Sequence, residues 1–313
     1  MIRQRLFNAL KIIVSLGLIA FILTKVGLAE TWNALRGAHW GFMAVALTLF
    51  VLTLPLRALR WQALLDGLGV HVSIIRLTGL YFVGTFFNIL LPTGVGGDVI
   101  RAVELTQDSR HGAEAVGTVF VDRLTGLLVL FVIALVALPF SYRLVRPEVT
   151  VAIVVMALAG VVGGWLLLQG DLLGRIGRRL SFLPAQDKLE KLYRAIGGCG
   201  RRALAGALVV SVLFNLANIL VNYLIALALG VHLSPWYFFA FVPVISFSLT
   251  LPVSLGGLGV REGAYVLLFG QAGVPPEQAL ALSLAYYAIT VATGLLGGLV
   301  YAVEGARGLK NET

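Results

Sequence analysis

The chain has 313 residues, of which 59% are hydrophobic and only 12% are charged, and its formal net charge is +9. A soluble domain has roughly a quarter charged residues, so this composition excludes a soluble globular enzyme, a disordered chain and a secreted scaffold. The single cysteine, Cys199, excludes an intramolecular disulfide framework and a multi-thiolate metal site. The basic excess is typical of cytoplasmic loops and anionic lipid contacts, so we expect no nucleic-acid partner.

Eight apolar runs, each near the roughly 20 residues that a transmembrane helix needs, follow one another along the chain. They lie at 7–26, 40–60, 74–91, 116–138, 149–169, 203–229, 236–250 and 279–302. A helix is the open-chain structure that satisfies every backbone polar group in lipid. The sequence therefore predicts an all-α polytopic membrane protein, a single transmembrane domain over 1–313 with about eight transmembrane helices.

The distribution of basic residues does not fix the orientation of these helices. A cytoplasmic N-terminus agrees with the basic residues near both termini and in several loops: Arg3, Arg5, Arg57, Arg60, Arg143, Arg146, Arg307 and Lys310. Eight crossings then place the loop 170–202 outside, although it carries eight of the 24 basic residues, against the positive-inside rule. Either one apolar run does not cross, or one hairpin does, or this loop is an exception, and these alternatives stay open.

The chain contains an internal duplication. Residues 68–73 (LGVHVS) recur as 229–234 (LGVHLS), and the pattern LP-x3-GG-x3-R occurs at 91–101 and again at 251–261. Two matches in the same order predict two copies of one unit, at about 41–138 and 203–302, joined by a connector at about 139–202. The basic part of this connector has the pattern of amphipathic helices on an anionic membrane surface, with a docking surface for a partner enzyme as the alternative.

The repeated LP-x3-GG-x3-R segments are the candidate substrate site. In repeat-built transporters, Gly/Pro-interrupted segments at matching positions of the two halves mark the binding site. We expect each segment to form a re-entrant hairpin in which Pro ends one helix, and a Gly pair (Gly96-Gly97 or Gly256-Gly257) precedes a short second helix. The N-terminus of each short helix, with Arg101 or Arg261 one turn further on, then offers an anion site. The alternative is a tight surface loop with a snorkelling arginine.

Three motifs at these positions carry a family resemblance. They are Pro92–Arg101 (PTGVGGDVIR), Val121–Leu127 (VDRLTGL) and Pro252–Glu262 (PVSLGGLGVRE). The chain resembles the flippase-like transmembrane region of lysylphosphatidylglycerol synthases and their stand-alone relatives. The resemblance implies movement of lipids, or of lipid-linked amino acids or sugars, between leaflets. It does not imply synthase activity, because the chain ends at Thr313 where the full synthases continue into a soluble aminoacyltransferase domain.

The second unit departs from the first at its polar positions. Leu258 stands where Asp98 stands, and Tyr286-Tyr287 lie near the position of Asp122-Arg123. This difference argues against a mechanism that needs two equivalent acidic groups. Asp122 and Arg123 lie well inside a predicted span, where charges usually face a bundle interior or an aqueous cavity. In one interpretation Arg123 contacts a headgroup and Asp122 pairs with a hairpin arginine. In the other, the two residues form a structural ion pair.

Two helix faces are lined with polar side chains. Ser211, Asn215, Asn218 and Asn222 share one face of the sixth span, and Thr78, Tyr81, Thr85 and Asn88 share one face of the third. They predict a hydrophilic groove for a headgroup, with hydrogen bonding between helices as the alternative. Small-residue motifs at Gly160-x3-Gly164 and Gly294-x3-Gly298 predict close helix packing within the chain.

The leading functional hypothesis is a lipid flippase without an ATPase of its own. Its substrate is an anionic phospholipid, or a polyprenyl-phosphate or aminoacyl headgroup. The expected substrate-binding residues are Gly96, Gly97, Asp98, Arg101, Arg123, Asn215, Asn218, Gly256, Gly257 and Arg261, with Asp98, Glu104, Asp122 and Glu262 for proton coupling or charge balance. No catalytic residue, metal or cofactor is expected.

Two alternatives remain open at this stage. They are a membrane-embedded transferase acting on lipid-linked sugars, and a non-catalytic accessory subunit of a glycosyltransferase. The expected location is the plasma (inner) membrane of a prokaryote, with a lipid-modifying enzyme as a possible partner and the oligomeric state left open.

Overall fold

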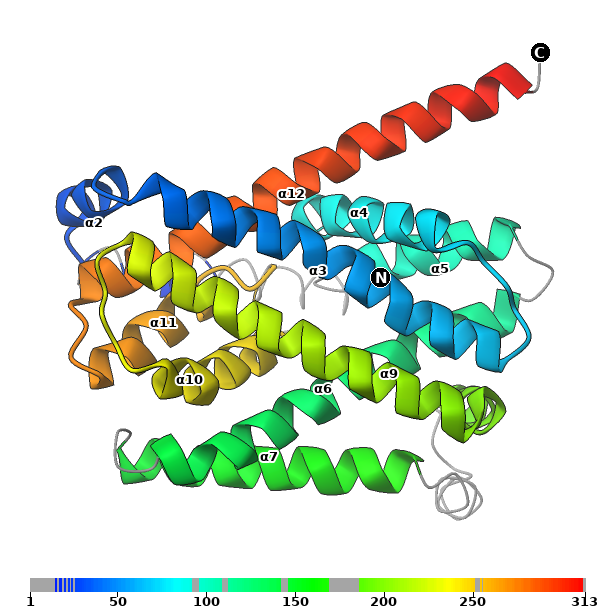
Figure 1. Cartoon of the computed structure of the whole chain (residues 1–313), viewed down its shortest axis with the longest axis horizontal. Helices are drawn as coiled ribbons and strands as arrows, with labels where there is room; N and C mark the ends of the chain where they lie inside the picture. The colour runs from blue at the N-terminus through cyan, green and yellow to red at the C-terminus, as the bar shows by residue number, and fades with distance from the viewer. Residues whose placement is uncertain are drawn as a thin grey trace.

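The computed structural model describes residues 26–91, 96–108, 112–141, 146–168, 186–250, 254 and 256–311, together with single residues between 15 and 24. Within this part of the chain every regular element is a helix, as predicted (Figure 1). The helices are α2 (Leu28–Arg36), α3 (Trp40–Gly67), α4 (Ile74–Leu90), α5 (Gly96–Asp108), α6 (Gly112–Ser141), α7 (Pro147–Leu168), α9 (Gln186–Ala228), α10 (Pro235–Ser248), α11 (Val260–Gln271) and α12 (Pro276–Asn311).

Four of the described helices are long and apolar enough to cross a membrane. They are Trp40–Gly67, Gly117–Phe140, Gly198–Ala228 and Pro276–Val303. Helix α7 covers the predicted fifth span, whereas the predicted first span, 7–26, lies largely outside the described residues. The third and seventh runs form α4 and α10, which have only 17 and 14 residues. These two helices are shorter than the roughly 20 residues of a full crossing, because each is the first arm of a broken hairpin.

The two hairpins turn by different means. In the first, residues 92–95 lie outside the described part, and α5 packs back on α4 so closely that a Cβ on Gly97 would overlap the carbonyl oxygen of Gly84. In the second, Gly256, Gly257 and Gly259 have φ values of 56°, 82° and 81°, a conformation that favours glycine. The Gly pair therefore allows α5 to pack closely on α4 in the first hairpin, and it allows positive φ values in the second.

The repeated LGVH loops end one helix and precede the next. Gly69 and Gly230 both have positive φ, and the N–H groups of Val70 and Val231 donate to the carbonyls of Leu65 and Ala226, the arrangement of a glycine helix C-cap. In both copies a serine directly precedes the next helix, and the Ser73 hydroxyl accepts a hydrogen bond from the Arg76 N–H. The repetition of this pattern in the two copies thus has a structural cause, the glycine C-cap and the serine that precedes the next helix.

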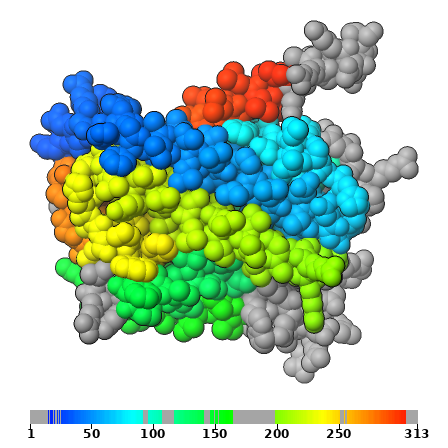
Figure 2. Space-filling view, in the orientation of Figure 1, coloured from blue at the N-terminus to red at the C-terminus, as the bar shows by residue number. Residues whose placement is uncertain are grey.

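The long helices α3 and α9 run antiparallel along each other, side by side across one face of the molecule (Figures 1 and 2). The N–H of His39, before α3, donates to the carbonyl of Ala228, at the end of α9, over 2.7 Å. At the opposite end, Gly67 approaches the backbone of Cys199 so closely that a side chain there would overlap it. Since α3 and α9 occupy equivalent places in the two sequence repeats, each helix starts where its counterpart ends.

The other contacts between the sequence repeats are reciprocal in the same way. Helix α4 packs on α12, with the Phe87 and Tyr301 rings 5.3 Å apart, and α10 packs on α6, with Phe131 and Phe247 5.2 Å apart. Gly294 and Gly298 lie against Ile89 and Phe86 of α4, so this small-residue motif packs within the chain as predicted. Helices α5 and α11 accordingly lie toward opposite ends of the molecule (Figure 1).

The hairpins also bear on the orientation problem. Helix α5 returns to the end of the molecule from which α4 starts, so the chain makes no net crossing between Ile74 and Asp108 (Figure 1). The start of the membrane part of α9, at Cys199, lies beside Gly67, at that same end. The basic connector thus enters α9 at this end of the molecule. Helix α12 runs toward the same end (Figure 1). This arrangement agrees both with an apolar run that does not cross and with a hairpin that crosses and returns, so the membrane topology stays a prediction.

Candidate functional site

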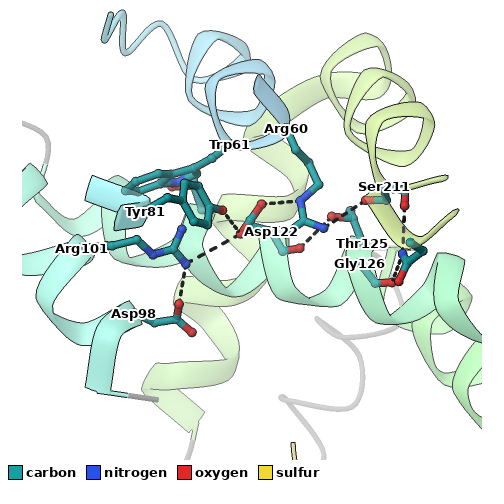
Figure 3. Close-up of polar contacts among 11 residues, drawn as sticks. Arg60, Trp61, Tyr81, Asp98, Arg101, Asp122, Thr125, Gly126 and Ser211 are labelled. Carbon is teal, nitrogen blue, oxygen red and sulfur yellow. Dashed lines mark hydrogen bonds and ion pairs between the residues drawn. The ribbon is translucent and has the colours of Figure 1, made fainter. Parts of the chain in front are cut away.

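Buried charged side chains gather where α3, α4, α5 and α6 meet (Figure 3). Asp122 of α6 lies at their centre: one carboxylate oxygen accepts from Arg60 Nε at 2.6 Å and the other accepts from the Tyr81 hydroxyl at 2.6 Å. The side chains of Arg60 and Asp122 are 4% and 1% exposed, so solvent does not screen their attraction. Hydrogen bonds from two neighbours to one buried carboxylate make Asp122 the structural centre of the cluster.

The first hairpin brings Arg101 to this cluster. Its guanidinium lies over the Tyr81 ring, 3.9 Å from the centroid, and over the Trp61 ring at 4.9 Å. It forms an ion pair with Asp98, one turn earlier in α5, and its Nη2 lies 3.8 Å from an Asp122 oxygen. The structure thus places Asp122 beside a hairpin arginine, one of the two roles that the sequence suggested for it.

Asp98 is shared between two arginines. Besides Arg101, it forms an ion pair with Arg123 of α6, whose side chain is 35% exposed and lies at the rim of the cluster. Within the hairpin, the Gly97 N–H donates to the Asn88 side-chain oxygen at 2.8 Å. The hairpin groups proposed to bind an anion therefore have partners within the chain in this structure.

The polar face of α9 is used for contacts between helices. Ser211 accepts a 3.3 Å hydrogen bond from Arg60 Nη1, and Asn215 donates to the carbonyl of Gly126 in α6 at 3.2 Å (Figure 3). Asn218 accepts from the Tyr286 hydroxyl of α12 at 2.9 Å, and Asn222 accepts from Tyr265 at 2.5 Å. These bonds correspond to the alternative interpretation of this face, while the hydrophilic groove stays a prediction.

The second hairpin carries a smaller cluster. The Glu262 carboxylate accepts from Arg261 Nε at 3.0 Å and from the N–H of Gly259 at 2.7 Å, which closes the N-terminus of α11. The Arg261 guanidinium also lies 4.1 Å from the centroid of the Tyr287 ring. In this arrangement a carboxylate of the chain itself occupies the position that an anionic headgroup would take at a helix N-terminus.

Some predicted residues lie apart from these clusters, and two important arginines were not predicted. Glu104 contacts Arg76 at 3.5 Å, half-exposed, and takes no described part in the Asp122 cluster. Arg57 and Arg60 lie at the end of the predicted run 40–60 and were used only to judge orientation, but α3 continues to Gly67, so both lie well within the helix. The signal that indicates this is the LGVH cap, which ends α3 seven residues after the apolar run.

Among the described residues no group of three or more His, Cys, Asp or Glu side chains is suited to hold a metal ion. His71 lies on the surface, 2.9 Å from Asp66. The charged clusters consist of arginines with fewer or equal numbers of carboxylates. Such donor sets favour binding of an anion over binding of a metal cation.

Several known proteins are similar to this chain over most of its length. A UPF0104 membrane protein of Pyrococcus horikoshii is 26% identical over 88% of this chain and 89% of its own length. A UPF0104 membrane protein of Methanothermobacter thermautotrophicus is 24% identical over 88% of each chain. The glycosyltransferase AglD of Haloferax volcanii is 27% identical over 95% of this chain, which spans only 55% of that protein.

The family comparison covers nearly the whole chain and includes both hairpins. Residues 8–298 match the family described as the lysylphosphatidylglycerol synthase TM region. The motifs on which the resemblance rested, at 92–101, 121–127 and 252–262, all lie within this match. The chain is therefore an integral membrane protein that belongs to the lysylphosphatidylglycerol synthase transmembrane-region family.

Proposed function

We propose that this protein moves a lipid with an anionic headgroup between the two leaflets of a membrane. The observation that carries the proposal is the buried cluster at the first hairpin, where Arg57, Arg60, Arg101 and Arg123 outnumber Asp98 and Asp122. An excess of positive charge inside a membrane helix bundle is costly and usually serves a substrate or ion pathway. Arginine suits a phosphate because its fixed donors form paired hydrogen bonds with two oxygens.

The arrangement of the two sequence repeats supports this function. We propose that the units, about 41–138 and 203–302, form an inverted repeat, since α3 and α9 are antiparallel and the hairpins lie toward opposite ends. Inverted repeats with broken helices are typical of transporters, whose substrate site lies between the repeats. By the positive-inside rule, the end that bears the basic connector and the C-terminus faces the cytoplasm. In a prokaryotic cell this membrane is the plasma membrane.

The hairpins have distinct roles in the proposed mechanism. The headgroup displaces Asp98 from Arg101 at the cytoplasmic hairpin and, in the other access state, Glu262 from Arg261. When no headgroup is bound, Asp98 and Glu262 pair with the arginines, which lowers the free-energy cost of burying their charges. The lipid chains remain in the bilayer while the headgroup crosses between the repeats.

Reconstitution provides the direct test. Purified protein in liposomes is supplied with headgroup-labelled phosphatidylglycerol or polyprenyl phosphate, and an impermeant quencher reports which label reaches the outer leaflet. We expect exchange above that of empty liposomes, and loss of exchange in Arg101→Gln and Arg261→Gln. The control is Arg36→Gln, a cation–π arginine of α2 that lies over Trp32, outside both clusters. Exchange equal to that of empty liposomes for all these lipids would overturn the proposal.

A second candidate function follows from one relative. The protein named glycosyltransferase AglD matches this chain over 95% of its residues, which suggests a role in handling lipid-linked sugars. If the chain were itself a transferase, incubation with lipid-linked sugar would change the mass of the lipid. Transport leaves the lipid covalently unchanged, so mass spectrometry of the recovered lipid separates the two functions. An accessory role would instead require that a glycosyltransferase co-purify with the chain.

A further inference from the structure

Arg57 differs from every other arginine of the Asp122 cluster. It lies on α3, one turn before Arg60, and its Nε is buried. Its guanidinium forms no hydrogen bond and no ion pair with the described residues, although Arg60, Arg101 and Arg123 are each paired with a carboxylate. The contacts of the Arg57 guanidinium are with aromatic rings: it lies 4.7 Å from the centroid of the Tyr81 ring and 5.4 Å from that of the Phe214 ring.

Arg57 lies between the two sequence repeats. Tyr81 belongs to α4 of the first repeat, whereas Phe214 belongs to α9 of the second. The Arg57 guanidinium is therefore at the junction of the two repeats, in contact with one aromatic ring from each.

The chain contains no described group that accounts for this charge. Burying a cation without a counter-ion costs several kcal/mol, and cation–π contacts of this kind return only about 1–2 kcal/mol. A leucine or methionine would fill the same helix face at lower cost. Arg57 as a whole is partly buried, but its Nε is fully buried and its charge has no counter-ion among the described residues, which favours a ligand of opposite charge.

A second unused donor lies close by. Nη1 of Arg101 is buried and has no hydrogen-bond partner among the described residues, and the Arg101 guanidinium contacts the same Tyr81 ring as Arg57. Four arginines, Arg57, Arg60, Arg101 and Arg123, face two carboxylates, Asp98 and Asp122, although Arg57 and Arg123 are only partly buried. The cluster thus has an excess of positive charge.

We propose that Arg57 binds the phosphate of the lipid headgroup at the junction of the two repeats, with Nη1 of Arg101 as a second donor. The phosphate is assigned as a diester, the form present in phosphatidylglycerol, and the test below compares it with a phosphate monoester. The identity of the ligand as a lipid rests on the proposed function, but binding at Arg57 does not depend on transport. Arg57 is then a substrate-binding residue that belongs to neither hairpin motif.

Thermal unfolding of the purified full-length protein in a non-ionic detergent tests this proposal. The variants are Arg57→Gln and Arg57→Lys, with Arg36→Gln as the matched cation–π control. Added phosphatidylglycerol raises the Tm of the wild type and of Arg36→Gln. In Arg57→Gln the lipid-free Tm is equal to or above that of the wild type, and phosphatidylglycerol binds about tenfold more weakly or worse. Arg57→Lys keeps the charge and retains part of the lipid effect.

The opposite pattern would overturn the proposal. If Arg57→Gln lowers the lipid-free Tm and leaves the phosphatidylglycerol shift intact, Arg57 is a packing cation that joins α3 to Tyr81 and Phe214. If polyprenyl phosphate, a monoester, stabilises the wild type and phosphatidylglycerol does not, the assignment to a diester is wrong. If glycerol phosphate alone gives the full shift, the site binds a free anion and not a lipid. If the wild type binds phosphatidylglycerol in an Arg57-dependent way but does not transport it in liposomes, the proposed function is wrong and the assignment of Arg57 stands.

Discussion

The two hairpins share one sequence pattern but have different electrostatic surroundings. Arg101 of the first hairpin lies in a network that extends over α3, α4, α5 and α6, whereas Arg261 of the second pairs with Glu262, the next residue in the chain. Counted from the LGVH loops, Asn218 stands where Arg57 stands and Val221 where Arg60 stands. The duplication therefore preserves the Gly/Pro pattern and the hairpin arginine, while the positions of Arg57 and Arg60 have charged residues in the first copy only.

This difference indicates how the two halves divide their tasks. The first hairpin has long-range partners, so its arginine is held in place by several helices and its net charge is positive. The second hairpin is neutral and closed by a local capping interaction, so its arginine can be exposed by moving one side chain. If the proposed function holds, we expect a substrate anion to bind more strongly at the first hairpin, which lies at the end that receives the basic connector.

The largest expected effect comes from the centre of the network. Asp122→Asn leaves Arg60 without its charged partner in a buried site, which costs about 3–5 kcal/mol of folding free energy. Glu262→Gln also removes the carboxylate partner of the buried Arg261, but this carboxylate serves one arginine where Asp122 serves two, and the amide keeps an acceptor for the Gly259 N–H. We therefore expect a smaller cost, on the order of 2 kcal/mol. The measurement is the Tm of each purified variant in detergent. Equal losses would contradict the distinction between a network and a local pair.

How far the sequence predicted this comparison depends on the type of signal. Hydropathy predicted the helices and the Gly/Pro pattern predicted both hairpins, because each depends on local chemistry. Arg57 and Arg60 were missed because hydropathy ends the second apolar run near the first arginine. The helix continues since Trp61, Leu64 and Leu65 are fully buried in the bundle beyond that point. Burial by other helices is a long-range property that no local window contains.

The members of the charged cluster were predicted from local signals, but most of their pairings were not, because these depend on long-range packing. Asp122 was chosen because charge inside an apolar segment is rare, and Asp98 and Arg101 because they lie in the repeated hairpin motif; the structure places all three together. The partnership of Asp122 with Arg60 joins residues 62 positions apart and needs the packing of α3 on α6. The inverted relation of α3 and α9 likewise depends on three-dimensional pairing, which a repeated motif leaves open.

An intermediate effect is expected from the different turn geometries of the hairpins. Gly97→Ala forces a Cβ against the Gly84 carbonyl, where backbone meets backbone, and we expect a loss of about 1–3 kcal/mol with separation of α5 from α4. Gly270→Ala in α11 is the control, because its Cβ meets nothing within 4 Å and alanine favours a helix. The readout is again Tm, and a stable Gly97→Ala variant would mean that the first hairpin tolerates a wider separation of its arms.

The smallest expected effect comes from removing one tyrosine hydroxyl in each repeat, one bonded to a charged group and the other to a neutral group. Tyr81 donates to the Asp122 carboxylate and Tyr265 donates to the Asn222 amide oxygen, both from buried positions. Removal of a bond to a charged group costs about 1.5–3 kcal/mol and of a neutral one about 0.5–1.5 kcal/mol, so Tyr81→Phe lowers the Tm more than Tyr265→Phe. The ring contacts survive in both variants, which restricts the comparison to the hydroxyl groups. Equal shifts, or a larger shift for Tyr265→Phe, would mean that the second repeat depends as strongly on its neutral hydrogen bonds as the first depends on charge, and the proposed division of tasks between the hairpins would lose its energetic basis.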